Sequence, residues 1–221
     1  MIVACKEVSL KSWAKIVYTK HSSNLCSLMR SGNTKIPRST GIFNMSSATD
    51  CPSKKLGLCK ACEQRAKCYA IKSENTSRPD VLPFRRKQEI YWKSVKAKEF
   101  VSEFVLLNAL KEAPYQNIRF SEAGDFNAQE CVDKSEEIAK MLRRFGVRVY
   151  GYTSRSDLDF SKIRHLIITG SNFKKKGISN VFRIVTDVKK DRKKGEGVCK
   201  GDCRICKLCL MRNMKIVVKK H

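Results

Sequence analysis

The sequence has few histidines, few acidic residues for its number of basic ones, and no long apolar run. Only 3 histidines are present, and none lies near a cluster of cysteines. A run of about 18 or more uncharged apolar residues, which a membrane-spanning helix needs, is missing. The N-terminal residues also lack the apolar region and small-residue cleavage site of a signal peptide. We therefore expect a cytoplasmic protein that has no membrane partner.

Acidic residues are too few to balance the basic ones. The chain has 21 Asp and Glu but 46 Lys and Arg, and its net charge is +25. A compact chain with this charge repels itself unless a polyanion neutralises it. Nucleic acid is the favoured partner, because Lys and Arg gain affinity by releasing counterions from phosphates. The alternative is an ordinary solvated surface. The expected phosphate contacts are Arg85, Arg86, Lys87, Lys174, Lys175, Lys176, Lys189, Lys190, Arg192, Lys193 and Lys194.

Cysteine is abundant, with 11 residues. In a reducing cytoplasm this number favours metal ligation over disulfides. Thiolates separated by two residues can reach one metal centre, and the steps in the C-terminal group suit an iron–sulfur cluster better than a zinc ribbon. We expect one or two clusters, of the 4Fe-4S type, with zinc as the alternative. The expected ligands fall into two groups, Cys51, Cys59, Cys62 and Cys68 in the first, and Cys199, Cys203, Cys206 and Cys209 in the second.

Strands and helices alternate along the middle of the chain. Short β-rich runs occur at GIFNM, NIRF, VRVYGYT, HLIITG and VFRIV, and a helix is expected over 85–113. A second helix is expected to begin with an Asn127–Glu130 cap, to bury Phe145 among others, and to end at Gly146. This alternation predicts an α/β fold with parallel strands. We expect an N-terminal segment (1–40), an α/β domain with the first cysteine group (41–187), and a basic linker with the second group (188–221).

Polar turns follow three of the expected strands, and the carboxyl ends of parallel strands share one edge of a sheet. The side chains there are suited to a small polar ligand, a phosphate or proton transfer, although Ser and Asp also cap helices in such loops. The candidate catalytic residues are Glu122, Asp125, Arg155 and Asp157. The candidate cofactor-binding residues are Ser121, Gly124, Ser154, Ser171 and Asn172.

Several motifs occur together in an order that is known from one family. These are FNM, DCP and CYA, then RFSEAGDF, then YGYTSRS, and finally the C-terminal cysteines. In this order the chain resembles the phage "gene product 88" family over roughly residues 41–210, and it is similar to three-cysteine phage proteins related to radical S-adenosylmethionine enzymes. The resemblance implies an incomplete TIM-like barrel, a host cytoplasmic location, S-adenosylmethionine as a further cofactor, and Cys62 as an addition to the first group.

Three functions compete on these observations. The first is an iron–sulfur protein that binds nucleic acid. The second is a radical S-adenosylmethionine-like enzyme that acts on a nucleotide or nucleic acid. The third is a non-catalytic module that is stabilised by structural zinc (zinc-stapled) and binds nucleic acid or another partner. If the two cysteine groups serve one function, we expect them to lie on the same side of the domain.

Overall fold

A computed structural model describes residues 24–59, 68–76 and 79–219, and these form an open sheet of eight strands with helices beside it. All neighbouring strands run parallel except the first pair, β1 and β2. The edge strands are β1 and β7, so the sheet is not closed. In sheet order the strands are β1 (Arg30–Ser31), β2 (Thr40–Phe43), β3 (Asn117–Phe120), β4 (Arg148–Thr153), β5 (Ile167–Ser171), β6 (Asn180–Val185), β8 (Lys215–Lys219) and β7 (Gly197–Val198).

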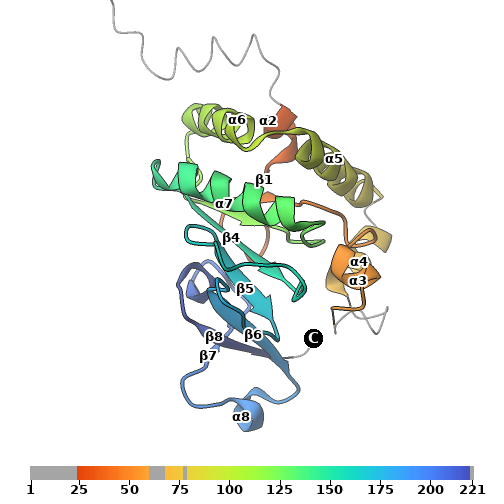
Figure 1. Ribbon diagram of the computed structural model, residues 1–221, viewed down its shortest axis with the longest axis vertical. Coiled ribbons are helices and arrows are strands. Elements are labelled where there is room, and N and C mark those ends of the chain that lie inside the picture. Colours follow the sequence, from red (N-terminus) through yellow and green to blue (C-terminus); the bar gives the residue numbers. More distant parts are fainter. Residues whose placement is uncertain (1–23, 60–67, 77–78, 220–221) are drawn as a thin grey trace, which may run out of the picture.

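One face of the sheet is covered by helices, and two short helices lie at one end of it (Figure 1). The covering helices are α2 (Asn24–Leu28), α5 (Val81–Ser94), α6 (Ala97–Leu110) and α7 (Gln129–Arg143). The shorter elements are α3 (Pro52–Lys55), α4 (Tyr69–Asn75), α8 (Val188–Asp191) and the 3-10 turn η2 (Leu208–Leu210). Helix α8 lies at the opposite end of the molecule from α2 and α6.

The main core lies between this helical layer and the sheet. Its centre is an aromatic cluster of Phe43, Trp92, Phe100 and Phe120, whose ring centroids are 5.4–6.4 Å apart. None of these four side chains is measurably exposed. Edge-to-face aromatic pairs contribute about 0.5–1.5 kcal/mol each beyond their buried area, so this cluster fixes β2 and β3 against α5 and α6.

The opposite face of the sheet carries polar and aromatic side chains. Arg119 of β3 is paired in register with Tyr150 of β4, and Tyr152 follows on the same face because side chains alternate along a strand. The segment Cys199–Cys209, which we call the C-terminal cysteine segment, lies on this side, since η2 contacts β4 and β5. Backbone hydrogen bonds hold it: the Cys199 amide donates to the Val217 carbonyl of β8 at 2.9 Å, and the Cys203 amide donates to the Lys35 carbonyl at 2.8 Å.

The strands agree with the sequence-based predictions better than the helix boundaries do. The five expected strands are present, and Gly146 has the positive φ of 73° that a C-terminal helix cap requires. The single helix expected over 85–113 is wrong, because the chain breaks at Val95 into α5 and α6. The expected Asn127 cap is also wrong, since α7 begins after Ala128 without a side-chain cap. Phe145, expected to be buried, is 59 % exposed.

The sheet gains its last parallel strand from the C-terminal region. Strand β8 inserts between β6 and β7, and η2 precedes it in the chain. The mixed α/β class with parallel strands is confirmed. The open sheet leaves the incomplete TIM-like barrel as a prediction.

Candidate functional site

Asp125 is the centre of a hydrogen-bond network at the carboxyl ends of β3 and β4. Its carboxylate accepts bonds from Ser53 Oγ at 2.6 Å, Thr153 Oγ1 at 2.7 Å and the amides of Ser154 and Phe126 at 2.7 and 2.8 Å. Burial raises the pKa of Asp125, and these donors oppose the rise. Ser53 belongs to α3, and α3 begins directly after Cys51. The network therefore ties the first cysteine group to the sheet. Asp125 therefore has a structural task that accounts for all its described contacts.

Arg155 and Asp157 form a bidentate ion pair beside this network. Arg155 Nε and Nη2 each donate to the Asp157 carboxylate at 2.8 Å, and Nη1 donates to the carbonyls of Phe126 and Asn127. The hydrogen bonds from Arg155 hold the pKa of Asp157 below its ordinary value. The Asp157 side chain is 42 % exposed while that of Arg155 is buried. The pair thus fixes the loop after β4 to the loop after β3.

Glu122, the fourth candidate catalytic residue, contacts other residues than those of the Asp125 network. Its carboxylate accepts a hydrogen bond from Asn33 Nδ2 at 2.5 Å and lies 3.9 Å from Arg85 Nη2. Its carbonyl accepts a bond from the Tyr69 hydroxyl at 2.6 Å. The strand ends do bring three predicted residues together, but Glu122 joins the region around α4 and α5.

The candidate cofactor-binding residues serve different roles. Gly124 has φ 72°, and a side chain there would meet the Ser46 carbonyl at 2.5 Å, so only glycine fits this turn. Ser154 donates to Asp125 through its amide, whereas Ser171 is half-buried and Asn172 is exposed at φ 63°. Ser121 differs from these, because its hydroxyl is buried and has no hydrogen-bond partner among the described residues. Of the five, Ser121 has the polar group best placed to receive a ligand.

The first cysteine group surrounds α3 and α4. Cys51 precedes α3 and is 9 % exposed, and burial together with the charge of Asp125 raises the pKa of its thiol to about 12. Cys59 follows α3 and contributes to the same shift, while Cys68 immediately precedes α4. Cys62 lies outside the described residues. The group therefore begins at a buried thiol beside the Asp125 network.

The C-terminal cysteine segment carries four half-buried cysteines, and its turn η2, which includes Cys209, contacts β4 and β5. No disulfide joins these four described residues. Cys203 interacts electrostatically with Cys199 and Cys206, and Cys209 does so with Cys199 and Cys203. The Tyr152 hydroxyl forms a hydrogen-bonding interaction with the Cys209 thiol, whose pKa burial raises to about 11. Within the described ranges, no group of three or more His, Cys, Asp or Glu side chains is arranged so that it could hold a metal ion.

Arg119 lies between the two cysteine groups. It interacts electrostatically with Tyr69, the residue after Cys68, and with Cys203 and Cys209 of the second group. Its guanidinium also stacks over the Tyr152 ring, 5.0 Å from the ring centre. These contacts agree with the expectation that the groups lie on one side of the domain. Arg119 was not among the residues predicted from the sequence, although an arginine inside an apolar strand was a usable signal.

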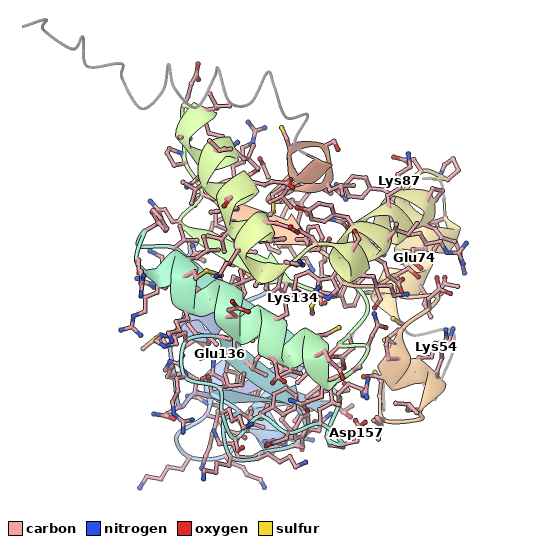
Figure 2. All side chains as sticks on the ribbon, turned by 45° about the horizontal axis from the view of Figure 1, so that its top comes forward. Lys54, Glu74, Lys87, Lys134, Glu136 and Asp157 are labelled. Carbon is pink, nitrogen blue, oxygen red and sulfur yellow. The ribbon has the colours of Figure 1, made fainter. Side chains whose placement is uncertain are left out.

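The predicted phosphate contacts do not form one set. Arg85 is only 4 % exposed and pairs with Glu74 at 2.7 Å, so the prediction that it contacts nucleic acid is wrong. Figure 2 shows Glu74 beside α5 and away from the sheet. Arg86 pairs with Asp50 at 2.9 Å, and the ammonium groups of Lys174 and Lys175 donate to backbone carbonyls. Exposed positions are held by Lys87, Lys176, Lys189, Lys190, Arg192, Lys193 and Lys194.

The exposed basic residues are dense near the C-terminal cysteine segment. Lys189 and Lys190 lie on α8, and Lys193 and Lys194 follow it before β7 leads into the segment. The segment itself adds exposed Lys200, Arg204 and Lys207, of which Arg204 pairs with Asp202. We call this stretch, 189–207, the basic edge.

Comparison with known proteins identifies one family to which the chain belongs. In the parts that the structure describes, no helix has the length and apolarity needed to cross a bilayer. No curated protein and no solved structure matches the sequence. A sequence profile of the family described as Gene product 88 does match, over residues 15–174, which is most of the chain. The phage family that the sequence resembles is thereby confirmed, and the chain belongs to the Gene product 88 family.

Proposed function

We propose that this protein is a metal–thiolate protein of phage origin that binds nucleic acid. The observation that supports it best is the series of four half-buried cysteines on one segment, whose turn η2, with Cys209, contacts β4 and β5. Thiolate ligands suit an iron–sulfur cluster or zinc, and we favour iron–sulfur because three of the ligands follow one another at two-residue intervals. The first cysteine group is the candidate for a second centre.

The backbone of the segment has a turn between the first two proposed ligands. All four cysteines are half-buried. Gly201, at φ 73°, provides a turn between the first two ligands that a residue with a side chain would strain. The turn is anchored at Cys203 through its bond to Lys35.

Anaerobically purified protein should contain bound metal, and replacing Cys203 and Cys206 with Ser should abolish binding at the C-terminal centre. Thiolates are the ligands, and a hydroxyl group does not replace them for a soft metal. Iron, acid-labile sulfide and zinc would be quantified per chain. Iron with sulfide identifies a cluster, and zinc without sulfide identifies the zinc-stapled alternative. S-adenosylmethionine binding and cleavage by the reduced protein would test the enzymatic alternative on the same sample.

The matched control for this experiment is Cys131→Ser. Cys131 lies on α7 and accepts a bond from Trp92 Nε1 at 3.4 Å, far in the chain from both groups. Serine keeps an acceptor at that position, so metal content should equal that of the wild type. A double variant that keeps the full metal content of the wild type would rule out the C-terminal segment as a metal site.

The basic edge is the proposed nucleic-acid surface. Changing Lys189, Lys190, Lys193 and Lys194 to Gln should weaken binding to DNA or RNA and reduce its salt dependence. Each phosphate that the protein no longer neutralises reduces the slope of log affinity against log salt by about 0.9 on B-DNA. Filter binding of duplex DNA, single-stranded DNA and RNA over a salt series would measure the slope and distinguish the preferred nucleic acid.

A control with the same change in charge tests whether the surface or the net charge is responsible. Lys98, Lys140, Arg143 and Arg144 are exposed on the helical layer, away from the basic edge. Their replacement by Gln should leave most of the binding intact. Equal losses for the two quadruple variants would mean that the charge acts without a defined surface, and unchanged binding in both would refute the proposed partner.

A further inference from the structure

A cavity lies at the starts of β6 and β8. Figure 1 shows these strands on the side of the sheet toward α8, away from α5 and α6. The volume of the cavity is about 330 Å³, and pockets that hold small ligands have about 300–1,000 Å³. Its apolar part comes from the half-buried Val181 and Met214 and the buried Ile216. Such a floor favours a ligand with an apolar surface over a bare inorganic anion.

The rim of the cavity is positively charged. It carries Lys174, Arg183 and Lys215, and among its described residues the carboxylate of Glu196 is the only acidic group. Glu196 is paired with Arg183 at 2.7 Å, so these two charges cancel. No ion pair between described residues involves either lysine. The two lysines therefore leave the cavity with a net positive charge.

Polar groups of the rim remain available to a ligand. The Lys174 ammonium donates to the carbonyls of Ile178 and Ser179, which uses two of its three N–H groups. Loss of surrounding water lowers the pKa of Lys174, and an anion beside the ammonium would offset this loss. Asn213 is exposed on the same rim, and its side-chain amide can hydrogen-bond the edge of a base.

The basic edge adjoins this cavity. Arg183 Nη2 donates to the Asp191 carbonyl at 2.7 Å, and Arg192 Nε donates to the Glu196 carbonyl at 2.8 Å. The Lys193 amide donates to the Glu196 carboxylate, also at 2.8 Å. The residues that line the cavity are thus bonded directly to the loop that carries the exposed lysines. A nucleic-acid strand bound along the basic edge would pass the cavity.

We propose that the cavity holds one unpaired nucleotide of a nucleic-acid strand that is bound along the basic edge. The base lies against Val181, Met214 and Ile216, and the adjoining phosphate lies against Lys174 and Lys215. Single-strand binding sites combine a cationic groove with surfaces for the bases, and apolar side chains can hold an unstacked base as aromatic ones do. The inference rests on the proposed function, since it takes nucleic acid as the partner, and it adds a preference for unpaired strands.

Binding of a single-stranded oligonucleotide and of its duplex, measured by fluorescence anisotropy at one salt concentration, tests the inference. Met214→Glu places a carboxylate in the cavity. Met211→Glu is the matched control, because Met211 is 52 % exposed, lies outside the cavity lining and undergoes the same change in charge. Met214→Glu should bind the single strand about tenfold more weakly than the control, the order of affinity that contact with one base contributes. The two variants should bind the duplex equally.

A second pair of variants and a modified strand test the two parts of the nucleotide separately. Lys215→Gln should weaken single-strand binding more than Lys219→Gln, which makes the same change at the exposed far end of β8. For the base, single-stranded oligonucleotides would carry one abasic residue at each position in turn. At one position the abasic residue should weaken binding to the wild type and have no effect on Met214→Glu.

The outcomes separate the inference from the proposed function. A wild-type protein that binds neither oligonucleotide overturns both. Equal single-strand affinities of Met214→Glu and Met211→Glu overturn the inference alone. If Met214→Glu does not fold, equal affinities of Lys215→Gln and Lys219→Gln have the same consequence. Tight binding of a free nucleoside monophosphate, with no effect of any abasic residue, would overturn the strand as the occupant of the cavity.

Discussion

Replacement of Glu74 by Gln is expected to lower the free energy of unfolding by about 3–5 kcal/mol, the usual effect of leaving a buried charge without its partner. The Glu74 side chain is fully buried and its carboxylate lies 2.7 Å from Arg85 Nη1. It also accepts bonds from the amides of Ala48 and Thr49 and from the Thr49 hydroxyl, at 2.8–2.9 Å. A Gln amide would turn a donor toward these donors. Urea unfolding followed by circular dichroism would measure the decrease.

The effect should extend to the first cysteine group. Ala48 and Thr49 precede Cys51, and α4, which carries Glu74, follows Cys68. Glu74 and Arg85 therefore clamp both ends of the group. In the Gln variant, alkylation of the Cys51 peptide, followed by mass spectrometry, should be faster than in the wild type.

Glu89→Gln is the matched control for this substitution. Glu89 pairs with Lys93 one turn later on α5, at 2.8 Å, and the Lys93 side chain is 62 % exposed. Such pairs contribute about 0.5 kcal/mol or less. If the two Gln variants lose equal stability, the buried pair is not the clamp described here.

The pH dependence of stability tests the buried pair of Glu74 and Arg85 in a second way. Burial would raise the pKa of Glu74, but its hydrogen-bond donors, Arg85 included, hold it below the ordinary value. A carboxyl with a lowered pKa stabilises the fold above its unfolded pKa, and that stability is lost as the pH falls through the folded pKa. The Gln variant has no such group. The difference in stability between wild type and variant should therefore shrink as the pH falls below about 4.5.

The strands and their polar ends could be predicted because they depend on local patterns. NIRF and VRVYGYT are short β-rich runs followed by turn residues, and parallel order follows from their alternation with helices. The convergence of Asp125 and Arg155 follows from that order alone. The break between α5 and α6 was not predictable from apolar periodicity, because the apolar face continues through Val95 while the backbone leaves the helix.

The partners of the charged residues were outside the reach of sequence patterns. Arg85 stands in a basic run with Arg86 and Lys87, and nothing local distinguishes the one that is buried. Its burial depends on Glu74, eleven residues earlier, on a separate helix. Arg119 and Tyr152 meet only through the pairing of β3 with β4. Long-range interactions of this kind decide whether a charge binds a ligand or supports the fold.

Asp125→Asn should destabilise the protein by about 2–4 kcal/mol and loosen the first cysteine group. Hydrogen bonds to a charged acceptor contribute about 1.5–3 kcal/mol each, and a buried donor left unpaired adds a further cost. Asn can present only one oxygen to four donors. Either Ser53 and Ser154, which share Oδ2, or Thr153 and Phe126, which share Oδ1, therefore lose their acceptor. Urea unfolding would measure the stability, and alkylation of Cys51 would report on the attachment of α3 to the sheet.

Two further variants separate the role of Asp125 as a structural centre from a role in proton transfer. Asp133→Asn, on the exposed side of α7, removes the same charge and should change stability by less than about 0.5 kcal/mol. Ser53→Ala removes only the hydrogen bond from α3 and should raise Cys51 reactivity with a smaller decrease in stability than Asp125→Asn. If Asp125→Asn unfolds like the wild type and protects Cys51 equally, the carboxylate does not hold the loop, and a catalytic role for Asp125 becomes the better interpretation. The network thus predicts a fixed order of effects, Asp125 first, Ser53 second and Asp133 last.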